Sequence, residues 1–130
     1  MANPPRTKSY DLLESLLADR ILILDGAMGT MIQRYKLSEA QVRGERFRGH
    51  HKDLVRFSDI LCLTHPDKIT AIHRQYFAAG ADIVETNTFG ASLVGMDEFD
   101  LPRELVREIN TAAVRCARIA ADEWNERTPN

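Results

Sequence analysis

Two short apolar segments, residues 21–24 and 81–85, most constrain what this chain can fold into. Each is too short for a helix, and the isoleucine-rich first segment suits a strand that is covered on both faces. Each segment ends abruptly in small polar residues, and helical patterns lie before, between and after the two. Strands that alternate with helices pair in parallel through right-handed crossovers. The sequence therefore predicts an α/β fold with a parallel sheet.

Three helices are expected around these strands. Four leucines on one face predict a short helix over residues 10–19, with Ser9 as its cap. Residues 64–67 form a capping-box arrangement that starts a second helix, and Gly80 ends it. A third helix is expected over residues 102–127, and its alanines would let it lie close to a sheet. Its inner stripe consists of Leu105, Ile109, Ala112, Ala113, Cys116, Ala120 and Trp124.

The segment from residue 35 to residue 57 is charged and has no clear period, so we expect a long loop with at most one helical turn. Loops of this length are uncommon in compact domains and tend to be functional. Within it, residues 43–47 read as a solvated charged loop that Phe47 anchors to the fold. A second loop follows the strand at residues 81–85.

Composition limits the class of protein. Hydrophobic residues make up 44% of the chain and charged residues 28%, which is typical of a globular domain. The net charge of −2 gives no field that would attract nucleic acid or an anionic membrane. No stretch reaches the about 18 apolar residues of a membrane span, and residues 1–9 read as a disordered leader without a signal sequence. We therefore expect a cytoplasmic protein.

The candidate site lies where the two strands end, because ligands of parallel α/β proteins bind at the carboxyl ends of the strands. In residues 25–30, Gly26 and Gly29 can adopt unusual backbone angles and so turn N–H groups toward an anion. A plain tight turn explains the same residues equally simply. At the second strand, Glu85 is either solvated at the rim or positioned for an ammonium group.

The metal-capable residues show no ligand pattern. Cys62 and Cys116 lie far apart in unrelated contexts and read as reduced, buried, small apolar residues. The adjacent pair His50 and His51 reads as a surface feature, because neither has a partner at helical spacing or a nearby cysteine.

Three motifs, residues 24–33, 43–47 and 79–89, resemble the start of the homocysteine-binding domain of cobalamin-dependent methionine synthases. The first and third are shared with the wider homocysteine methyltransferase family, whereas the second resembles the cobalamin-dependent branch. The resemblance implies a partial TIM (β/α)8 barrel, consisting of its first two βα units and a leading N-terminal helix. Residues 10–127 would form this part of the barrel, and residues 128–130 would be a truncated end.

The resemblance also implies a function. Such enzymes hold homocysteine on zinc as a thiolate, and methylcobalamin, regenerated by methyltetrahydrofolate, supplies the methyl group that gives methionine. The zinc cysteines of the family lie in segments beyond residue 130, so we expect no catalytic residue, no metal ligand and no stably bound cofactor in this chain, which is expected to be inactive alone. Its partners would be homocysteine, the rest of the barrel, and folate- and cobalamin-binding domains. The expected homocysteine-binding residues are Asp25, Gly26, Ala27, Glu85, Thr86 and Asn87.

Other functions stay open from the sequence. A noncatalytic amino-acid-binding module would keep the same half-site, and a betaine- or S-methylmethionine-dependent methyltransferase would share two of the three motifs. A nucleotide-binding protein would use residues 25–30 as a phosphate turn, but the glycine pattern of such sites is absent. A barrel needs about 250 residues, so we expect a chain with two open strand edges to be marginally stable or self-associating.

Overall fold

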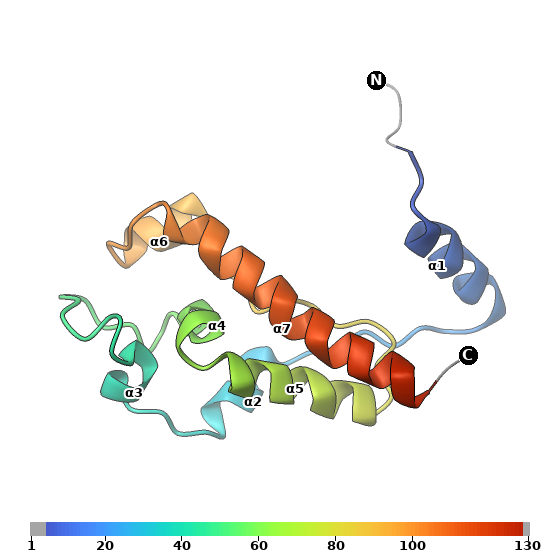
Figure 1. Cartoon of the computed structure of the whole chain (residues 1–130), viewed down its shortest axis with the longest axis horizontal. Coiled ribbons are helices and arrows are strands. Elements are labelled where there is room, and N and C mark those ends of the chain that lie inside the picture. The colour runs from blue at the N-terminus through green and yellow to red at the C-terminus, as the bar shows by residue number, and fades with distance from the viewer. Residues whose placement is uncertain (1–4, 129–130) are drawn as a thin grey trace.

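The computed structural model describes residues 5–128, and helices form nearly all of its regular structure (Figure 1). The two long helices α5 and α7 lie side by side, and α1 stands apart from them. A 3-10 turn, Ser58–Ile60, precedes α4. In chain order the helices are α1 (Lys8–Asp19), α2 (Met28–Gln33), α3 (Glu39–Arg43), α4 (Leu61–Thr64), α5 (Pro66–Ala78), α6 (Leu93–Glu98) and α7 (Leu105–Arg127).

The two predicted strands are present only as a single parallel bridge between Leu24 and Ile83, and the described residues contain no regular strand. The direction of pairing is as predicted, but the expectation that both faces are covered is wrong. Ile21 is 87% exposed and Ile23 is 55% exposed. Two paired strands alone are marginally stable unless a third strand or a packed face supports them, and within residues 5–128 each of these segments pairs only with the other.

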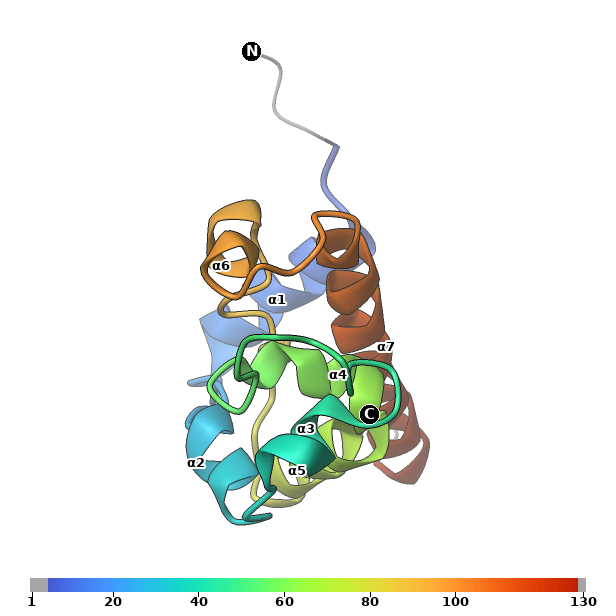
Figure 2. The same ribbon diagram turned by 90° about the vertical axis from the view of Figure 1, so that its left-hand side faces the viewer.

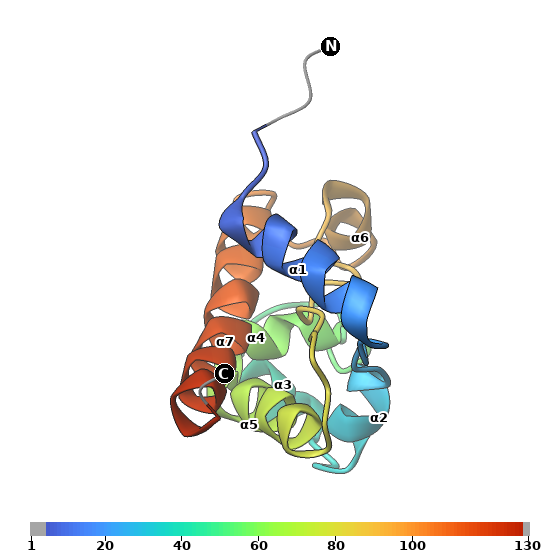
Figure 3. The same ribbon diagram turned by 90° about the vertical axis from the view of Figure 1, so that its right-hand side faces the viewer.

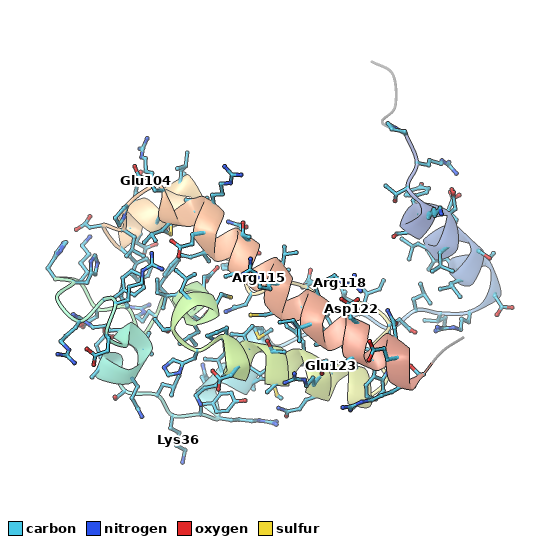
Figure 4. The ribbon with its side chains drawn as sticks, viewed as in Figure 1. Lys36, Glu104, Arg115, Arg118, Asp122 and Glu123 are labelled. Carbon is cyan, nitrogen blue, oxygen red and sulfur yellow. The ribbon has the colours of Figure 1, made fainter. Side chains whose placement is uncertain are left out.

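The core extends from the contact between α5 and α7 to the long loop, the 3-10 turn, α4 and α6. Its largest fully buried side chains include Ile69 and Ile72 of α5 and Ile109 of α7. The small residues of α7, among them Ala113, let this helix approach another helix, α5, and not the sheet that the sequence suggested. Farther along the helix pair, Arg74 of α5 donates two hydrogen bonds to Glu123 of α7, at 2.6 and 2.7 Å (Figure 4).

The helix boundaries confirm some predicted signals and correct others. Gly80 ends α5 as expected: its φ of +104° is readily adopted only by glycine, and its amide donates to the Phe77 carbonyl at 3.0 Å. Thr64 does not cap α5, because its hydroxyl bonds back to the Ile60 carbonyl, and His65 occupies the cap position without a capping bond from its side chain. The third predicted helix begins at Leu105, three residues later than predicted.

Four short helices, α2, α3, α4 and α6, were not predicted as separate elements, although one helical turn was expected in the long charged loop that contains α3. In the long charged loop, Ser38 and Gln41 form a true capping box that starts α3. α2 starts within the residues expected to form a glycine turn, and α6 lies between the second apolar segment and the third predicted helix. α2 packs on α5, and α3 packs on α4 (Figure 2). Helices of one or two turns carry too little periodic pattern to be recognised from sequence.

α1 begins at Lys8, inside the segment expected to be a disordered leader, and its cap is Thr7 in place of Ser9. Residues 1–4 of that leader, and residues 129–130 of the expected truncated end, lie outside the described residues. None of the α1 side chains is buried, although Leu12 and Leu17 are apolar. The helix lies in front of the bundle, and the segment after α5 rises toward it (Figure 3). None of the helices within residues 5–128 has the length and hydrophobicity to cross a membrane.

Candidate functional site

The first loop of the site follows Leu24 and turns directly into α2. The turn depends on Ala27, which has left-handed backbone angles of φ 36° and ψ 42°. The expectation that Gly26 and Gly29 supply the unusual angles is therefore wrong, because neither has a positive φ. A left-handed alanine costs on the order of 1 kcal/mol, so the surrounding contacts must hold this turn in place.

Asp25 joins the first loop to the second. Its backbone amide donates to the Ile83 carbonyl at 2.9 Å, and its carboxylate Oδ1 accepts a hydrogen bond from the Glu85 amide at 2.9 Å. Partial burial raises the pKa of the Asp25 carboxyl above its usual value, while the bond from Glu85 acts in the opposite direction. One carboxylate thus fixes the relative position of the two strand ends.

The second loop, residues 85–90, is anchored from below. Only 5% of Asn87 is exposed, and its side-chain amide donates to the Ser58 carbonyl at 2.9 Å. The Cys62 thiol donates to the Asn87 carbonyl at 3.6 Å. At the surface of the loop, the hydroxyls of Thr86 and Thr88 share a hydrogen bond of 2.8 Å. The side-chain N–H groups of Asn87 therefore hold the loop to its support.

The two loops line an open pocket of about 770 Å³. It brings together all six residues that the sequence assigned to the site, and their role in binding stays a prediction. Its charged lining residues are Asp25 and Glu85, with no basic side chain among the lining residues, so the pocket favours a cationic group. Sequence reasoning missed Ser58, which no strand-end argument could have found. The lining residues are Asp25, Gly26, Ala27, Met28, Gly29, Ser58, Val84, Glu85, Thr86, Asn87, Thr88 and Phe89.

The two cysteines are buried, as predicted, and they meet although they are far apart in sequence. A hydrogen bond with Cys116 and burial raise the pKa of the Cys62 thiol well above its usual range. Neither cysteine lines the pocket. In residues 5–128 no three His, Cys, Asp or Glu side chains gather in a way that would hold a metal ion. The part of the chain that the structure describes therefore offers no set of side chains that fits a zinc ion.

In the loop of residues 43–47, Glu45 and Arg46 are exposed, as expected, whereas Arg43 is largely buried in an ordered network of contacts. Arg43 pairs with Glu39 at 2.6 Å and donates to the backbone carbonyls of His50 and Lys52. Glu39 also accepts the amides of residues 54 and 55, at 2.7 and 2.6 Å. Phe47 is buried, as predicted. This network closes the long loop on itself, away from the residues that line the pocket.

Three of the four histidines form hydrogen bonds that join segments of the fold, and the fourth has no hydrogen-bond partner among the described residues. The His50 ring contacts the Phe99 carbonyl, and the His51 ring contacts the Asp100 carboxylate, both at 2.8 Å. These contacts join the long loop to the turn after α6. His65 contacts the Gln41 carbonyl at 2.7 Å. His73 is fully buried in α5, and neither of its ring nitrogens has a hydrogen-bond partner among the described residues.

Comparison with known proteins identifies the family. Residues 22–129 match the sequence model of the homocysteine S-methyltransferase family. The chain belongs to this family. Its match begins at the first apolar segment and includes both pocket loops.

A solved structure shows the same fold over this part. The homocysteine methyltransferase MmuM from Escherichia coli, in an oxidized form, is similar with a TM-score of 0.70 and 24% sequence identity. The similarity covers 91% of this chain and 36% of the MmuM chain, so the chain spans about a third of that structure. The predicted fold class is thus supported as a fragment of a TIM-barrel homocysteine methyltransferase. A partial barrel is not established by this chain itself, since the bridge of Leu24 and Ile83 is its only strand pairing within the described residues.

Proposed function

We propose that this chain contributes part of the homocysteine pocket of a methyltransferase that converts homocysteine to methionine. Membership of the homocysteine S-methyltransferase family supports the reaction class. The observation that carries the proposal is the pocket in which both polar strand ends meet, with Asp25 bonded to the Glu85 amide.

The chemistry of the pocket suits one end of homocysteine. An ammonium group is complementary to the carboxylates of Asp25 and Glu85, and an ammonium beside Asp25 would offset the cost of burying that carboxylate. The apolar side chains of Met28 and Val84 suit the methylene groups of the amino acid. We therefore assign the amino-acid end of homocysteine to the Asp25 side of the pocket and its sulfur to the side of Thr86 and Asn87.

The methyl donor is a finer part of the proposal. Residues 43–47 resemble the cobalamin-dependent branch, which supports methylcobalamin regenerated by methyltetrahydrofolate. Betaine or S-methylmethionine is the alternative donor. In such an enzyme, zinc would bind the sulfur of homocysteine and keep it as a thiolate, because a metal-bound thiol loses its proton near neutral pH. The cysteines that would hold it are proposed to belong to other segments, so no step of the reaction is assigned to Cys62 or Cys116.

Calorimetric titration of homocysteine into the metal-free chain tests the pocket directly. We expect binding that weakens roughly 10- to 150-fold in the Asp25→Ala variant, since a hydrogen bond to a charged group contributes about 1.5–3 kcal/mol. Asp122→Ala is the matched control, because Asp122 lies on the outer side of α7 and pairs only with Arg118 (Figure 4). Equal loss in both variants, or no binding to the wild-type chain, would contradict the proposal.

A methyl-transfer assay separates the enzyme part from a noncatalytic binding module. The module is favoured by one observation, namely that the pocket is formed without metal ligands. With zinc and methylcobalamin supplied, the 130-residue chain should be inactive, and a version extended through the family's zinc cysteines should transfer the methyl group. An inactive extended version would favour the binding module, and equal activity of the two would show that our assignment of the site is wrong.

A further inference from the structure

A buried carboxylate lies directly beneath the second loop of the pocket. It belongs to Asp59, in the 3-10 turn Ser58–Ile60, and only 3% of this residue is exposed. Its Oδ1 accepts a hydrogen bond from the Gly90 amide at 2.9 Å. No Lys, Arg or His forms an ion pair with it within residues 5–128. Burial accordingly raises the pKa of the Asp59 carboxyl.

A carboxylate in this position is costly for folding. Removing a charged group from water is unfavourable unless a partner compensates it, and here the compensation comes from backbone amides alone. An apolar side chain at residue 59 would avoid that cost. The contribution of Asp59 must therefore lie in what its carboxylate holds in place.

Asp59 holds the second loop, and Ser58 and Cys62 beside it make two further contacts with the same loop. Ser58 accepts the Asn87 side-chain amide at 2.9 Å, and Cys62 donates to the Asn87 carbonyl at 3.6 Å. Gly90 also fits closely, because a Cβ atom there would lie 3.0 Å from the Phe57 ring. Residues 58–62 thus form a platform for the loop, and among the described residues Asp59 supplies the charged contact of this platform.

We propose that Asp59 is a positioning residue, which fixes Gly90 and thereby holds the loop of Glu85 to Thr88 against Asp25 in a shape that fits homocysteine. Asp59 does not itself line the pocket, so it acts through the loop and not through contact with a ligand. The inference rests on the proposed homocysteine pocket, but the attachment of the loop can be measured without any ligand.

Amide hydrogen exchange in two variants tests the proposal. In Asp59→Ala, exchange at Gly90 should accelerate roughly tenfold or more, and homocysteine affinity should fall by a similar factor. Exchange in the centre of α7, at Ile109 and Ala113, should stay unchanged. Asp59→Asn should retain both properties, because its amide oxygen still accepts the Gly90 bond. Asp122→Ala is again the surface control.

The results that would overturn the proposal are distinct from those that would overturn the function. Unchanged Gly90 exchange in Asp59→Ala would show that the carboxylate does not position the loop, and Asp59→Asn as impaired as Asp59→Ala would show that the hydrogen bond to Gly90 is not the contact that holds the loop. If Asp59→Ala does not fold, NMR of the wild-type chain decides, since a coupling across the hydrogen bond between the Gly90 nitrogen and the Asp59 carboxyl carbon is expected and its absence refutes the contact. If the wild-type chain fails to bind homocysteine, the proposed function fails and the exchange result still decides the role of Asp59.

Discussion

His73 should make the stability of this chain depend on pH in a way that one substitution removes. The imidazole is fully buried in α5 without a hydrogen-bond partner among residues 5–128. Burial lowers the pKa of His73 from 6.5 to about 4. The unfolded chain therefore binds a proton near pH 6.5, whereas the folded chain binds it only near pH 4. The free energy of unfolding must then fall as the pH decreases through this window.

The size of the effect follows from the shift in pKa. One pKa unit corresponds to about 1.4 kcal/mol, so the full window amounts to about 3 kcal/mol, of which about 2 kcal/mol falls between pH 7 and pH 5. His73→Leu removes the titrating group and keeps an apolar side chain of similar size. We expect the variant to be at least as stable as the wild type at pH 7, because it removes an unpaired buried polar group.

Urea denaturation of both chains at pH 7 and at pH 5 measures the effect. The carboxylates that titrate in this range are common to the two chains, so their contribution cancels when the loss in free energy of unfolding between pH 7 and pH 5 is compared between the chains. The wild type should lose about 2 kcal/mol more than His73→Leu on acidification. Equal losses in the two chains would refute the reasoning, because His73 would then titrate alike in the folded and unfolded states.

Three further predictions concern other parts of the molecule. The exposed bridged segments should cause self-association, so Ile23→Lys should lower the concentration-dependent mass measured by light scattering. Val114→Lys, on α7 and with the same 55% exposure of the wild-type side chain, should leave the mass unchanged. A wild-type chain that is a monomer at every concentration would contradict this. Ser38→Ala removes the capping box of α3 and should cost about 1 kcal/mol in thermal unfolding, and an unchanged midpoint would show that α3 does not need its cap. Gly95→Ala would place a Cβ atom against the Gly90 carbonyl, so it should weaken homocysteine binding, and unchanged affinity would show that α6 does not support the second loop.

The sequence predicted those features that depend on long patterns. The 13 residues of α5 and the 23 residues of α7 are long enough for a helical period to be clear, and Gly80 has the positive φ that its position required. Parallel pairing of the two apolar segments also followed from their alternation with helices. Because the carboxyl ends of paired parallel segments meet at one edge, Asp25 and Glu85 could be placed in one pocket before the structure was known.

Features that depend on tertiary contacts could not be predicted. Nothing in the local sequence shows that Ala27 and not Gly26 takes the left-handed conformation, since that choice is set by the turn into α2. The support of the second loop by Ser58 and Asp59 joins segments about thirty positions apart, and no periodic pattern reports such a contact. Regular strands were expected from two short apolar segments, but a local apolar run does not show whether a neighbouring strand is present to cover it.

Chemical-shift mapping with isotopically labelled chain and unlabelled homocysteine examines the central claim most directly. The account predicts that amides of residues 25–28 and of residues 85–88 shift together, with one common dissociation constant, while those of the loop at residues 43–47 do not move. Shifts confined to one of the two pocket segments, or centred on another part of the molecule, would show that the paired strand ends do not form a single site for this amino acid.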